Sequence, residues 1–75
     1  MRIKKKYDLV KRFRNLFHEN KAFRNDCLGL HAGRVEPMPL VKTLVAQGYG
    51  DDTALTLEAL ATFVGQEAAY QSLRL

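Results

Sequence analysis

The sequence predicts a small all-α domain, a bundle of three to four helices formed by residues 1–75 as one unit. Three observations lead to this prediction. Apolar residues recur at three- and four-residue spacing along most of the chain, which is the period of a helix buried on one side. No stretch alternates apolar and polar residues between turn signals, so strands are not expected. The composition, 47% hydrophobic and 27% charged, is typical of a folded chain.

The first helix is predicted from Ile3 to Phe17, and it is amphipathic. Its apolar face carries Tyr7, Val10, Phe13 and Phe17, with Leu9 and Leu16 beside them. Its polar face is mostly basic and carries Lys4, Lys5, Asp8, Lys11, Arg12 and Asn15. A basic face of this kind is either a solvated surface or a binding surface for an acidic partner.

Asn20 is expected to cap a second helix, although continuation of the first helix fits the pattern equally well. The buried stripe of this second helix would be Phe23, Cys27 and Leu30. Gly33 fits a helix stop, because glycine readily adopts the left-handed conformation that ends many helices.

The segment Ala32–Pro39 is expected to connect two helices, because its two prolines disfavour helix. Pro39 is acceptable as the first residue of the third helix. The inward side chains of that helix would be Leu40, Val41, Leu44 and Val45, and Gly48 would end it.

The fourth helix, Thr53–Leu73, is the longest apolar-periodic run. The residues predicted to form its buried stripe are Leu57, Leu60, Ala61, Val64 and Ala68, widened by Phe63, Tyr70 and Leu73. The preceding Asp51 and Asp52 carry negative charge that suits the positive end of a helix dipole, and we expect the cap at Thr53 or Thr56. A helix this apolar must be covered by the rest of the chain, by a second copy or by another protein.

The net charge of +4 is unevenly divided along the chain. Residues 1–35 hold ten basic and three acidic side chains, a net charge of +7, whereas residues 36–75 carry −3. A bipolar molecule is expected. Its positive half favours an acidic partner, either nucleic acid or an acidic protein surface, and its negative half favours head-to-tail contact between copies.

The sequence offers no pattern typical of catalysis or of metal binding. Cys27 and His31 are four residues apart, but structural zinc requires four ligands and no second cysteine is present. Ser72 lacks a glycine-flanked nucleophile elbow, and the glycines form no phosphate-binding loop. We therefore expect no enzyme activity, no cofactor and no metal.

A cytoplasmic protein is expected. No apolar run approaches the ~18 residues of a membrane span, and the basic N-terminus leads into further charge instead of a signal-peptide core. The single cysteine is compatible with a reducing compartment.

Leu40–Gly48 and the helix after it have about the length of a helix-turn-helix motif. The second helix, however, would present Asp51, Asp52 and Glu58 to a polyanion, and phosphates repel carboxylates. Any contact with nucleic acid is therefore expected through the basic N-terminal helix, by backbone contacts with little sequence readout.

Several short segments occur in an order that resembles the nif-type leader-peptide domain, a family of nitrogen-fixing bacteria and of the precursors of modified ribosomal peptides. These segments are an F-x-x-L-F core at Phe13, Leu16 and Phe17, the stretch Asn20–Arg24, the end of a small helix at Gln47–Tyr49, and a helix start at Leu55–Leu60. The resemblance implies a small helical module that a modifying enzyme or another protein recognises, without catalysis of its own.

Together these observations predict a non-catalytic protein-protein interaction module, an adaptor, regulator or inhibitor that binds a larger protein. The candidate partner-binding residues are Lys4, Lys5, Lys6, Tyr7, Lys11, Arg12, Phe13 and Arg14. Tyr7 and Phe13 would be the anchors, provided that their helix face is not all core. The alternative is sequence-independent nucleic-acid binding by the same face, and homodimerisation through Thr53–Leu73 is compatible with either.

Overall fold

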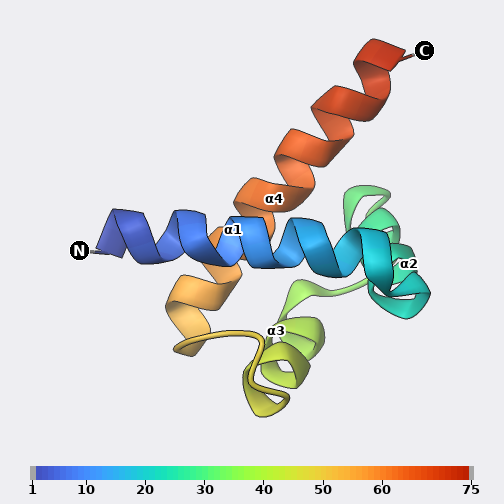
Figure 1. The fold of residues 1–75 in the computed structure, drawn as a ribbon. Coiled ribbons are helices and arrows are strands. Elements are labelled where there is room, and N and C mark those ends of the chain that lie inside the picture. Colours follow the sequence, from blue (N-terminus) through green and yellow to red (C-terminus); the bar gives the residue numbers. More distant parts are fainter. Residues whose placement is uncertain (1, 75) are drawn as a thin grey trace.

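The computed structural model describes residues 2–74, with side chains described from residue 3 to residue 67. It contains the four α-helices α1 (Arg2–Glu19), α2 (Lys21–His31), α3 (Pro37–Ala46) and α4 (Thr53–Arg74). The described residues include no strand, and the predicted all-α class is confirmed. In Figure 1, α4 crosses α1 near the middle of α1, while α2 and α3 lie on one side of the crossing.

α4 is the helix on which the rest of the fold is assembled. α1, α2 and α3 each pack against it, and α1 also packs against α2. The side chains that α4 buries in these contacts are Leu55, Thr56, Ala59, Leu60 and Phe63. α4 therefore contributes buried side chains to its contacts with all three other helices.

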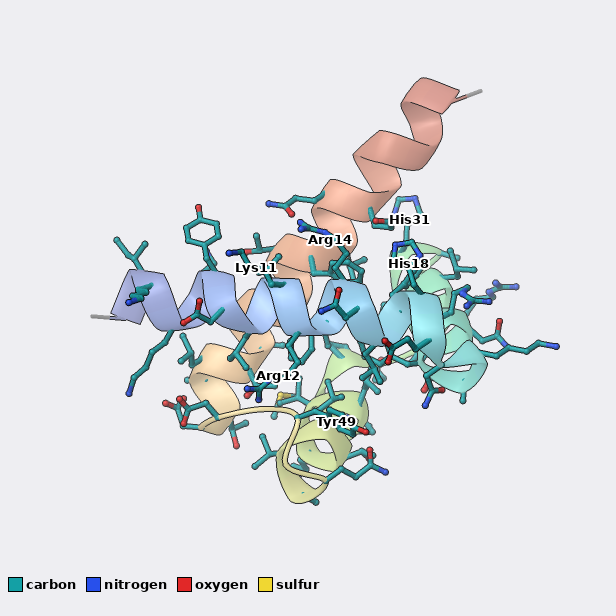
Figure 2. All side chains as sticks on the ribbon, in the orientation of Figure 1. Lys11, Arg12, Arg14, His18, His31 and Tyr49 are labelled. Atoms are coloured by element: carbon teal, nitrogen blue, oxygen red, sulfur yellow. The ribbon has the colours of Figure 1, made fainter. Side chains whose placement is uncertain are left out.

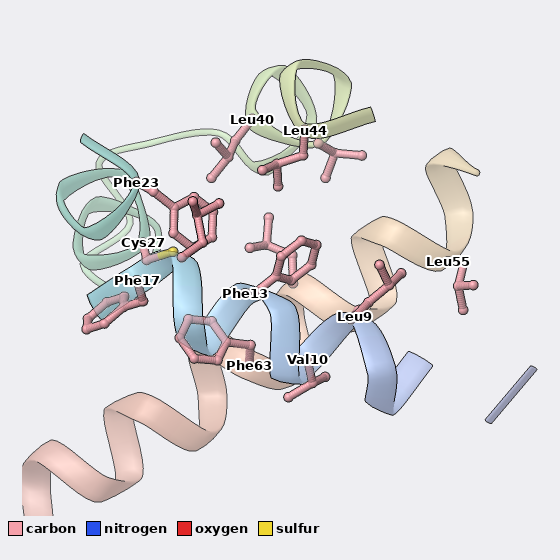
Figure 3. Close-up of a cluster of buried hydrophobic side chains, with 14 residues drawn as sticks. Leu9, Val10, Phe13, Phe17, Phe23, Cys27, Leu40, Leu44, Leu55 and Phe63 are labelled. Atoms are coloured by element: carbon pink, nitrogen blue, oxygen red, sulfur yellow. The ribbon is translucent and has the colours of Figure 1, made fainter. Parts of the chain in front are cut away.

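All four phenylalanines of the chain are buried in one cluster, which Figure 3 shows. The rings of Phe17 and Phe63 meet edge to face, with centroids 5.5 Å apart. The rings of Phe13 and Phe23 are tilted, with centroids 5.9 Å apart. Such pairs add about 0.5–1.5 kcal/mol beyond their area burial, so these contacts hold α1, α2 and α4 together.

The boundary between the first two helices lies where Asn20 predicts it. The Asn20 side-chain oxygen accepts a hydrogen bond from the Phe23 backbone N–H at 3.0 Å, which caps α2. The Arg24 guanidinium donates to the carbonyls of Phe17 at 2.9 Å and His18 at 2.8 Å, two of the carbonyls left unpaired where α1 ends. A single side chain of α2 therefore supplies hydrogen-bond donors to two carbonyl groups at the end of α1.

The predicted helix stops at Gly33 and Gly48 are also confirmed. Both glycines have positive φ, 76° and 82° respectively, the left-handed conformation that residues with a Cβ adopt rarely.

The predicted start of the third helix and the predicted cap of the fourth are wrong, whereas the fourth helix begins at Thr53 as predicted. α3 begins at Pro37 and not at Pro39, because the first turn has no intrahelical use for its N–H groups and tolerates both prolines. α4 is capped by Asp52 and not by Thr53 or Thr56, since the Asp52 carboxylate accepts from the Leu55 N–H at 2.7 Å. Thr56 is instead fully buried, and its hydroxyl accepts from the Asp51 N–H at 2.9 Å.

The predicted buried stripe of α4 is displaced around the helix. Of the stripe residues, Leu60 is buried, Leu57 and Val64 are half-buried, and Ala61 is exposed. The side chains of Ala68, Tyr70 and Leu73 lie outside the described residues. A helix with apolar residues on most sides does not define its inner face by its pattern alone, and here the covering helices decide it.

Two helical glycines are expected to respond oppositely to the same substitution. A Cβ at Gly29 would collide with a methyl group of Val35, whereas a Cβ at Gly65 would meet open space. We expect Gly65→Ala to raise the free energy of unfolding by about 0.5–1 kcal/mol and Gly29→Ala to lower it by about 1–3 kcal/mol. Urea denaturation of both variants measures the difference, and equal stabilisation by the two would contradict the close approach of Val35.

Candidate interaction surface

The N-terminal turns of α1 form an arm that the bundle does not cover. None of the residues 3–8, called here the N-terminal arm, is buried, and the core begins at Leu9. Figure 1 shows these turns extending past the crossing with α4. Ile3 is 68% exposed and Tyr7 is 50% exposed, so the arm presents two large apolar side chains to solvent.

The charge of the arm does not stabilise its own helix. The first turn of α1 contains no acidic residue, and lysines occupy positions 4, 5 and 6. Cations near a helix N-terminus oppose the helix dipole by about 0.3–1 kcal/mol each. The arm is helical because it continues from residues 9–17, whose apolar side chains are buried, and helix stability alone does not explain its lysines.

The candidate residues fall into three groups. The first group consists of Lys4, Lys6, Tyr7 and Lys11, for which no hydrogen bond or ion pair to the other helices is present among the described side chains. Lys4 and Lys11 are exposed, and neither carries a side-chain hydrogen bond or ion pair within residues 3–67. Lys6 is half-buried, with its ammonium 5.9 Å from the centre of the Tyr7 ring. Ile3, Tyr7 and Lys11 follow one another at four-residue spacing and therefore share one side of α1.

The second group faces the connection between α3 and α4. Lys5 and Arg12 line a depression of about 200 Å³ together with two carboxylates of the same chain, Asp8 and Asp51. The Arg12 guanidinium also donates to the Tyr49 carbonyl at 3.3 Å, and Figure 2 shows Arg12 directed towards Tyr49. The charge of these two cations is therefore partly offset within the molecule.

The third group, Phe13 and Arg14, makes contacts within the bundle. Phe13 has no exposed area and belongs to the core, so it is not available as an anchor for a partner, and Tyr7 remains as the exposed one. The Arg14 guanidinium donates to the Gln66 side-chain oxygen of α4 at 3.4 Å. Sequence reasoning missed Ile3 as a second exposed anchor, although its position four residues before Tyr7 was a usable signal.

Cys27 and the histidines lie apart from this surface. Cys27 is buried, whereas His18 and His31 are exposed. Burial raises the pKa of the Cys27 thiol to about 12, with smaller contributions from the carboxylates of Asp26 and Glu67. A thiol with this pKa is neutral and a poor nucleophile near pH 7. Within residues 3–67 no three His, Cys, Asp or Glu side chains are grouped so that they could hold a metal ion.

Within the described part of the chain, no helix has both the length and the apolar character that crossing a membrane requires. Comparison of the chain with protein-family models, with curated proteins and with solved structures found no match. The resemblance to the nif-type leader-peptide domain therefore stays a prediction, and the proposals below are argued from the geometry and charge of this chain.

The buried thiol predicts a pH dependence of stability. Folding raises the Cys27 pKa from 9.0 to about 12, so the folded state holds this proton more tightly than the unfolded state. The resulting stability is complete below pH 9 and is lost as the pH rises towards 12. The unfolding free energy of the wild type minus that of Cys27→Ala should stay constant below pH 9. Above pH 9 this difference should decrease, because only the wild type loses the contribution of the protonated thiol. Denaturation series at several pH values measure it, and a flat difference would contradict the raised pKa.

Proposed function

We propose that the chain is a small non-catalytic protein-protein interaction module that binds an acidic surface of a larger protein through its N-terminal arm. It would act by docking, as an adaptor, regulator or inhibitor. The observation that supports this proposal best is the pair of exposed apolar side chains, Ile3 and Tyr7, on a helix end rich in lysine.

The combination of apolar and cationic groups favours a protein partner. A protein surface can bury the exposed area of Ile3 and Tyr7, which contributes about 25 cal/mol per Å², while its carboxylates pair with Lys4 and Lys11. A nucleic-acid backbone gains little from apolar side chains and depends on the number of cations in contact. Asp8 and Asp51 beside Lys5 and Arg12 reduce the positive field that a phosphate backbone would meet. Nucleic-acid binding is therefore the second candidate.

Charge reversal at Lys4 of the arm and at Lys11, one helical turn beyond Tyr7, tests this proposal. Lys4→Glu combined with Lys11→Glu should weaken binding at least about tenfold, without loss of helicity, because both side chains are exposed. The matched control is Lys21→Glu with Lys42→Glu, which makes the same change in net charge at two exposed positions outside α1. Circular dichroism checks the fold of both double variants.

The binding assay uses the tagged chain on a solid support and a lysate divided into nuclease-treated and untreated halves. A discrete protein should be retained from both halves by the wild type and by the control, but not by the arm variant. Retention by the arm variant equal to that of the control overturns the role of Lys4 and Lys11. Retention that disappears after nuclease treatment, with a steep salt dependence, favours nucleic acid instead.

A further inference from the structure

Two depressions in the surface share the lining residue Val35, and together they are called here the α4 groove. The first, of about 310 Å³, is apolar, and Leu57, Ala61 and Val64 of α4 line it together with Leu30. The second, of about 440 Å³, lies between α2 and the start of α3, and its lining includes the carboxylates of Asp26 and Glu36. Val35 lines both, so the apolar depression is adjacent to the one that Asp26 and Glu36 line.

The α4 groove lies on the side of α4 that faces away from α1. Gln66 marks the side towards α1, because it is hydrogen-bonded to Arg14. Leu57 is nine residues before Gln66, which is about two and a half helical turns, so the two side chains leave α4 on opposite sides. The groove and the N-terminal arm are therefore presented on different sides of the same molecule.

The arm has the chemistry that the groove would recognise. Ile3 and Tyr7, four residues apart on one helix, match the anchor spacing of an amphipathic helix docked in an apolar groove. Lys4 and Lys11 flank these anchors, and the acidic part of the groove offers Asp26 and Glu36. Arg34 is adjacent to Val35 in sequence but lines neither depression.

We infer that the α4 groove binds the N-terminal arm of a second copy of this chain. The contact joins two different surfaces, so it is heterologous, and each pair of molecules keeps one unused arm and one unused groove. Association therefore continues from head to tail into short chains or a closed ring. The inference shares the arm with the proposed function but does not depend on it.

A complementation experiment tests this contact. The anchor variant combines Ile3→Ser with Tyr7→Ser and keeps its groove. The groove variant is Ala61→Lys and keeps its arm. All three positions are exposed, so both variants should fold. The matched control, Ala22→Lys, adds the same charge at an exposed position outside the groove.

Sedimentation velocity over a concentration series should show reversible oligomers for the wild type and for Ala22→Lys. Each of the two variants alone should be monomeric, with the concentration needed for association raised at least about tenfold. An equimolar mixture of the two variants should form a heterodimer and nothing larger, because only one intact arm and one intact groove remain.

Three outcomes overturn the inference: a wild type that stays monomeric at all concentrations, association that survives Ala61→Lys, or variants that do not complement each other when mixed. Failure here is distinguishable from failure of the proposed function. Ala61→Lys leaves the arm intact, so it should abolish self-association while retaining the lysate partner. The Lys4 and Lys11 reversal should impair both.

Discussion

The constraint on which this structure depends is the need to cover α4. Its apolar side chains occupy more of its circumference than one neighbouring helix can bury, and α1, α2 and α3 each pack against it. The edge-to-face contact of Phe17 with Phe63 joins α1 to α4, and the hydrogen bonds of the Arg24 guanidinium join α2 to the end of α1. Removing the buried face of α4 would leave the other three helices without a shared surface.

A chain of 75 residues completes this covering only in part. Small domains bury a lower fraction of their surface than large ones, about 60% at this size. The apolar side chains that stay at least partly exposed include Leu57, Ala61 and Val64 on α4 and the anchors Ile3 and Tyr7 on the arm. The α4 side chains and the arm anchors lie on different sides of the molecule, with Asp26 and Glu36 near the former and Lys4 and Lys11 near the latter. Both proposals of partner binding follow from this arrangement.

The two proposals make use of the same arm. An arm seated in the groove of another copy is not free for an acidic partner, so self-association and partner binding would oppose each other. By linkage, each would weaken the other by the same factor. The concentration of the chain would then set how much of its binding surface is available, with no change in the fold.

The sequence by itself determined the helical class and most of the helix boundaries, because caps and stops are local. Asn20 and Gly33 act on backbone groups within a few residues of themselves, and Gly48 ends α3 in the same way. Only the tertiary structure decided which apolar and basic side chains are free. Phe13 and Tyr7 were equivalent in the pattern, yet one is core and the other exposed. Arg12 and Arg14 bond to groups 37 and 52 residues away, and helix periodicity contains no information about contacts at such separations.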